Sequence, residues 1–140
     1  MADKMGTVPV VASPEGRTLP FIFAKPHRVK GEMVPEPMLY PSRAMIETRI
    51  RAMPKGASSS LAEMRAEMAR AHNAASTCPV TTQQQFHQIA EAAYEAWSQG
   101  RRDASVPFWR VVDPNKPSAR QLPGGAEFIR ARRAEEQAGR

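Results

Sequence analysis

The chain has 140 residues, of which 41% are hydrophobic, and this is enough apolar material for one modest core. Its 20 Lys and Arg outnumber 14 Asp and Glu, and the formal net charge of +6 favours a polyanionic partner such as nucleic acid or an anionic membrane surface. No apolar run is long enough to span a bilayer and the N-terminus has no signal pattern, so we expect a cytoplasmic protein. We also expect a monomer, with DNA rather than a membrane as its polyanionic partner. A basic protein with no polyanionic partner is the alternative.

The single cysteine, Cys78, excludes an intramolecular disulfide bond. With only three scattered histidines beside it, the chain shows no spacing typical of a metal site. The sequence therefore predicts neither a bound metal nor a cofactor.

Residues 1–41 hold 7 of the 13 prolines, which is too high a density for a helix because each proline removes a backbone donor. We therefore expect an extended Pro-rich arm. Residues 8–12 and 19–24 are short apolar pieces that suit an edge strand or a segment lying over the core. The arm also carries a basic cluster that would suit a phosphate contact or a solvated tail: Lys25, His27, Arg28 and Lys30.

Two helices are predicted next. Ser42 caps the first, which runs to Met53, where Pro54 and Gly56 end it. Ser60 caps the second, which runs to His72. Apolar residues at helical spacing give each of them a face for the core.

Two more helices are expected after the turn that contains Cys78. Thr82 is expected to cap the third helix, with Gln85 at the capping-box position, and an apolar stripe carries it to Gly100. The last helix is expected over residues 126–137, after the Gly124-Gly125 turn.

Between these helices lies the apolar run from Val106 to Val112. Its branched and aromatic residues favour an extended strand, in which successive side chains point to opposite faces. Trp109 and Arg110 would then lie on different faces. Such a strand is either buried on both sides or borders a pocket.

These elements together predict a mainly α-helical domain with a short β-hairpin, over residues 42–140. Helices separated by a turn and followed by a hairpin are typical of a helix-turn-helix or winged-helix module, whose recognition helix lies in a DNA groove. A glutamine amide can both donate to and accept from adenine, although glutamine is also an ordinary residue of a helix surface. The residues expected near double-stranded DNA are Ser60, Gln83, Gln84, Gln85, His87, Arg101 and Arg102.

Several motifs carry a resemblance to a known family. Pro54-Lys55-Gly56, the two helices after it, Pro107-x-x-Arg110-Val111 and Gly124-Gly125 resemble the DNA-binding domain of the methylated-DNA-protein-cysteine methyltransferases. The segment from Thr77 to Thr82, together with Pro107-Phe108-Trp109-Arg110, is more similar to a branch of relatives with the same turn and a Pro-Phe/Tyr-Trp-Arg segment. This closer match spans residues 38–137.

The resemblance implies DNA binding without catalysis. Phe108 stands at the position of the family's acceptor cysteine and Trp109 at that of its histidine, so self-alkylation at this site is excluded. Alkyltransferase-like proteins, which also lack that cysteine, bind alkylated guanine in DNA, flip the base and flag it for repair proteins. The implied base pocket comprises Pro107, Phe108, Trp109 and Arg110.

Two other functions stay open on sequence alone. One is a regulatory DNA-binding or adaptor protein that recognises no damage. The other is an enzyme that uses Cys78, which the start of the third helix would activate through the helix dipole. A small residue buried in a turn is the structural alternative for Cys78.

Overall fold

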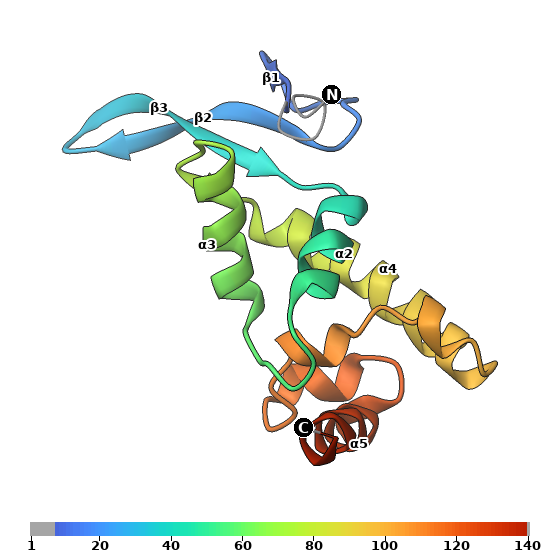
Figure 1. The fold of residues 1–140 in the computed structure, drawn as a ribbon. Helices are drawn as coiled ribbons and strands as arrows, with labels where there is room; N and C mark the ends of the chain where they lie inside the picture. Colours follow the sequence, from blue (N-terminus) through green and yellow to red (C-terminus); the bar gives the residue numbers. More distant parts are fainter. Residues whose placement is uncertain (1–7, 140) are drawn as a thin grey trace. The chain divides into compact units, whose positions relative to one another are not determined.

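The computed structural model describes residues 8–139, which group into two units (Figure 1). The described part of unit 1 comprises residues 8–42 and 62–82, and that of unit 2 comprises residues 43–61 and 83–139. Each unit is thus assembled from two stretches that are separate in the sequence. The chain passes from one unit to the other three times.

Unit 1 contains a four-stranded sheet with the strand order β1-β2-β3-β4. Its strands are β1 (Val10–Val11), β2 (Phe21–Val29), β3 (Glu32–Tyr40) and β4 (Ser76–Thr77). β2 and β3 are antiparallel, whereas β1 is parallel to β2 and β4 is parallel to β3. The sheet is therefore mixed, with two short strands at its edges.

β2 and β3 form a long hairpin (Figure 1). Every residue pair from Phe21 with Tyr40 to Val29 with Glu32 is in register. The connecting residues Lys30 and Gly31 have φ angles of 51° and 84°. A two-residue turn with both φ angles positive matches the right-handed twist of the strands, and glycine adopts it without steric cost.

The apolar end of this hairpin contributes to the buried part of unit 1. Phe21 stacks on Tyr40 with 4.6 Å between ring centroids, and Leu39 is fully buried. α3 (Leu61–Ala71) adds Met64 and Met68 to the buried residues.

This sheet corrects the expected fold class. A mainly α-helical winged-helix domain with one short hairpin is wrong, because helices combine with a four-stranded mixed sheet in an α/β fold. Strands occur from residue 10 to residue 40, where the prolines suggested an extended arm with an edge strand at most in residues 8–12 and 19–24. Proline excludes a helix but not a strand whose neighbour lies on one side only.

Unit 2 is helical. Its elements are α2 (Arg43–Ala52), most of α4 (Pro79–Ser98), α5 (Gly125–Ala138) and three short 3-10 helices, η1 (Arg102–Ala104), η2 (Phe108–Val111) and η3 (Pro117–Gln121). No helix in residues 8–139 is both long and apolar enough to cross a membrane.

The predicted helices are present, with one wrong boundary. α2, α3 and α5 begin and end within one or two residues of the expected positions. The expected cap at Thr82 is wrong, because α4 begins at Pro79 and the Thr82 hydroxyl donates to the Cys78 carbonyl inside the first turn. Proline suits this first position because its missing N–H would have no helical partner.

The strand expected from Val106 to Val112 is also wrong. Phe108–Val111 form the 3-10 helix η2, in which the Arg110 N–H donates to the Pro107 carbonyl. Trp109 and Arg110 do not lie on opposite faces, since both side chains contact Glu136. This contact with α5 favours a helical turn over the local strand preference.

Aromatic rings form the centre of unit 2. Phe108 is fully buried and lies 6.0 Å from Phe128 and 6.2 Å from Phe86, measured between ring centroids. Trp109 contacts both Phe108 and Trp97 at 5.7 Å. The rings therefore hold η2 between α4 and α5.

Candidate functional site

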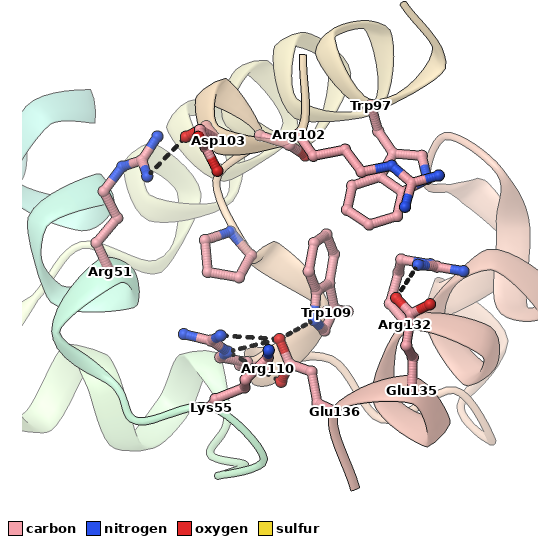
Figure 2. Close-up of a pocket in the computed structure, with 12 residues that line it drawn as sticks. Arg51, Lys55, Trp97, Arg102, Asp103, Trp109, Arg110, Arg132, Glu135 and Glu136 are labelled. Atoms are coloured by element: carbon pink, nitrogen blue, oxygen red, sulfur yellow. Dashed lines mark hydrogen bonds and ion pairs between the residues drawn. The ribbon is translucent and has the colours of Figure 1, made fainter. Parts of the chain in front are cut away.

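A pocket of about 460 Å³ opens in unit 2 (Figure 2). It lies among the end of α2, the end of α4, η1, η2 and α5. Five cationic and three acidic side chains line it, together with two tryptophans. The lining residues are Arg51, Lys55, Trp97, Arg102, Asp103, Ser105, Pro107, Trp109, Arg110, Arg132, Glu135 and Glu136.

A buried carboxylate organises one wall of the pocket. Glu136 accepts hydrogen bonds from the indole Nε1 of Trp109 at 2.9 Å and from Arg110 Nη2 at 2.8 Å. It also accepts the Gly56 N–H at 3.0 Å. Arg110 in turn donates through Nη1 to the Met53 carbonyl at 2.8 Å, so both charged groups are satisfied.

The hydrogen bonds change the acidity of this carboxylate. Burial by itself would raise the pKa of Glu136, but hydrogen bonds from Arg110, Gly56 and Trp109 and the charge of Arg110 outweigh it and lower the pKa. Glu136 is therefore ionised at neutral pH, and its charge is matched by Arg110.

The Trp97 ring forms another wall. The guanidinium carbons of Arg102 and Arg132 each lie 4.3 Å from its centroid, and Figure 2 shows both side chains beside the ring. Arg132 also forms an ion pair with Glu135. Arg102 and Arg132 are attracted by the negative faces of the indole, which fixes their guanidinium groups at the pocket.

Three of the cations have no ion pair with an acidic side chain among residues 8–139: Arg51, Lys55 and Arg102. All three are exposed. Arg51 donates long hydrogen bonds of 3.5 and 3.4 Å to the backbone carbonyls of Asp103 and Ala104, which leave its charge uncompensated. The pocket is therefore suited to an anion.

The four residues of the expected base pocket do not all line the pocket of unit 2. Pro107, Trp109 and Arg110 line the pocket, but Phe108 does not and is fully buried among aromatic rings. Trp109 is 4% exposed and uses its only donor on Glu136. Neither aromatic side chain of this pair presents an open ring face.

Of the residues expected near DNA, only Arg102 lines the pocket. Gln83 and Gln84 are exposed on α4, whereas Gln85 and His87 are half-buried there. Ser60 precedes α3, and Arg101 is exposed with its guanidinium group bonded to Gln99. Arg101 and Arg102 also line a second, more open pocket over residues 100–104, whereas Ser60, the three glutamines and His87 line neither pocket.

Sequence reasoning missed much of the pocket: Arg51, Lys55, Trp97, Arg132, Glu135 and Glu136. Trp97 lies in the apolar stripe of the third predicted helix, and no motif marks Arg132 as a site residue. One signal was available for Glu136. Glu136 follows Ile129 by seven residues, which is two helical turns, so both residues lie on the inward face of α5. A carboxylate on that buried face needs a cationic partner.

Cys78 lies in unit 1 at the start of α4. It is half-buried, and its Sγ accepts the Thr81 N–H at 3.5 Å. The pKa of Tyr40 is raised by burial and, secondarily, by the negative charge that Cys78 carries when ionised. No group of three metal-ligating side chains occurs in the described part of the chain.

Comparisons with family models, with curated proteins and with solved structures find no match to this chain.

Proposed function

We propose that this chain binds duplex DNA without catalysing a reaction on it, and that a backbone phosphate occupies the pocket of unit 2. The observation that carries the proposal is the set of three exposed cations around the pocket, Arg51, Lys55 and Arg102, none of which has an acidic partner among the described residues. Glu135 and Glu136 each have an arginine partner, so Asp103 is the acidic lining residue that offsets this charge, and the pocket keeps an excess of positive charge.

Electrostatics supports a polyanion over a small neutral ligand. A concave site lined mainly by one sign of charge focuses the field and raises the local concentration of counter-ions. Binding of DNA phosphates to lysine and arginine releases condensed counterions, which drives association and makes it depend on salt. The net charge of +6 on the whole chain favours the same partner.

The aromatic geometry favours DNA binding without recognition of damage. A flipped base needs an aromatic face on which it can stack. Phe108 is fully buried, Trp109 is 4% exposed and Trp97 has two guanidinium groups over its ring. We therefore propose that alkylated guanine is not selected over guanine. The proposed function therefore includes the DNA binding that the methyltransferase resemblance implies, but not the recognition of damaged bases.

Titration calorimetry of the full chain with a short duplex tests the proposal. We expect binding at low salt, equal affinities for duplexes with and without O-methylguanine, and a steep fall of affinity with salt. The triple variant R51Q/K55Q/R102Q should lower the slope of log affinity against log salt by roughly 0.9 for each cation that contacts a phosphate.

A charge-matched variant controls for the loss of net charge. K116Q/R120Q/R130Q removes three exposed cations of unit 2 that do not line the pocket. It should bind DNA more tightly than the pocket variant. Equal losses in the two variants would contradict the assignment of the pocket, and no binding by the wild type at low salt would contradict DNA binding altogether.

A further inference from the structure

The far half of the β2–β3 hairpin in unit 1 is a two-stranded ribbon. β1 pairs only with Ile22 and Phe23 of β2, and β4 pairs only with Met38 and Leu39 of β3. Within residues 8–139, residues 24–29 and 32–36 therefore pair only with each other, and Pro37 also accepts a hydrogen bond from the Ala75 N–H. Apolar residues that stay exposed on such a hairpin gain little stability from burial, so folding does not explain them.

The register assigns the side chains of this ribbon to two faces, because directly opposite residues lie on the same face and successive residues alternate. We define the proline face as Ala24, Pro26 and Arg28 of β2 with Met33, Pro35 and Pro37 of β3. The opposite, glutamate face comprises Lys25, His27, Val29, Glu32, Val34 and Glu36. Both glutamates of the ribbon therefore lie on one face.

The proline face is entirely exposed. All six of its residues are accessible, and Met33 keeps 56% of its surface exposed. On the glutamate face, by contrast, Val34 and Glu36 are half-buried. Arg28 is the only charged residue of the proline face, and its Nη1 donates to the Gly31 carbonyl at 3.1 Å, which holds it near the turn. Lys30 in the turn adds a second cation at this end.

The prolines argue against a partner that adds a strand. Strand addition needs a row of free N–H and C=O groups along an edge, and each proline removes a donor. Pro26 interrupts the β2 strand, and Pro35 and Pro37 interrupt β3. A partner of the ribbon must therefore contact its side chains.

We propose that the proline face of the ribbon lies in the minor groove of duplex DNA, as a second contact separate from the pocket of unit 2. This inference rests on the proposed DNA binding. Strands are used by several classes of protein to enter DNA grooves, and minor-groove proteins combine cations with apolar wedges of Met or Pro that kink the duplex. The proline face supplies this combination, with Met33 directly opposite Arg28.

The test compares two matched variants of the full chain. R28Q/M33S removes one cation and one exposed apolar side chain from the proline face. K25Q/V29S removes the same kinds of side chain from the glutamate face, where Val29 is 43% exposed. Because all four positions are exposed, both variants should fold, and circular dichroism confirms that they do.

Affinity and DNA bending are the two readouts. On circularly permuted DNA fragments, the wild type and K25Q/V29S should bend the duplex, whereas R28Q/M33S should bind about tenfold more weakly and lose the bend. The minor-groove ligand distamycin should weaken binding of the wild type but leave the remaining affinity of R28Q/M33S nearly unchanged.

The outcomes separate the two proposals. If the wild type binds DNA, the pocket variant loses affinity and R28Q/M33S bends the duplex like the wild type, the ribbon assignment fails while the proposed function stands. If the wild type does not bind, both fail. A change in self-association of R28Q/M33S, with unchanged DNA binding, would also overturn the assignment in favour of a protein partner.

Discussion

The indole Nε1 of Trp109 donates a 2.9 Å hydrogen bond to Oε2 of Glu136, which lies 27 residues later in the chain. The same carboxylate accepts from Arg110, so two neighbouring residues of η2 are fixed to one residue of α5. This bond joins the pocket wall to the aromatic core, because the Trp109 ring also packs on Phe108.

Removing the carboxylate charge should destabilise the protein. Glu136→Gln leaves Arg110 charged with only 12% of its side chain exposed, and loss of one partner of a buried pair typically costs about 3–5 kcal/mol. Urea unfolding followed by circular dichroism measures the change. Arg110→Gln should cost a similar amount. The double variant should cost much less than the sum of the two, because removing both side chains leaves no unpaired buried charge. Additive losses would mean that the two side chains do not stabilise each other.

Stability should also depend on pH through Glu136. Its pKa is lowered in the folded state, so the unfolded chain binds more protons in the acidic range and stability rises with pH there. The contribution is complete above the ordinary glutamate pKa, about 4.3, and is lost as the pH falls through the lower folded value. The stability difference between the wild type and Glu136→Gln should therefore shrink below about pH 4. A stability difference between the two proteins that stays constant across this pH range would contradict a lowered pKa of Glu136 in the folded state.

Two adjacent glycines provide a matched test of packing. Gly124 has φ +78°, and a Cβ there would lie 2.6 Å from both Tyr94 Cε1 and Phe128 Cβ. Gly125 has φ +65° but nothing within 4 Å of a Cβ. Gly125→Ala should cost about 1–2 kcal/mol from backbone strain alone. Gly124→Ala should cost about 1–3 kcal/mol more, because overpacking adds to that strain. Thermal unfolding compares them, and equal losses would show that the rings can move aside.

Phe108 offers a test of the methyltransferase resemblance. Because this position is fully buried, Phe108→Cys places a thiol inside the aromatic core. We expect it to lose stability through the cavity it creates, by about 3 kcal/mol, and to take no methyl group from O-methylguanine in DNA. Mass spectrometry of the protein after incubation is the measurement. A mass gain of one methyl group on this residue, absent in the wild type, would contradict this expectation and show that the position can accept an alkyl group.

Local patterns predicted the helices well because their determinants are local. Pro54 and Gly56 end the chain's first predicted helix, and the apolar residues at helical spacing within it include the buried Ile46 and Ile50. The start of α4 was missed because Thr82 is a good cap in isolation, while Pro79 is equally suited to a first turn.

The remaining differences come from contacts distant in sequence. The run from Val106 to Val112 has strand-like residues, but the hydrogen bonds of Trp109 and Arg110 to Glu136 decide its conformation. The long hairpin was missed because prolines lower strand preference, although Pro26 and Pro35 pair directly across a ribbon with free edges. The pocket draws on residues from Arg51 to Glu136, and no short motif links them.

The aromatic core has a spectroscopic consequence. The chain has two tryptophans, and Trp97 and Trp109 lie in unit 2 with 5.7 Å between their ring centroids. Intrinsic tryptophan fluorescence therefore reports on unit 2 alone, and its emission should respond when a ligand draws Arg102 away from the Trp97 ring. Unit 1 is silent in that signal, so a tryptophan placed at an exposed position of the ribbon would give each unit its own optical reporter within one protein.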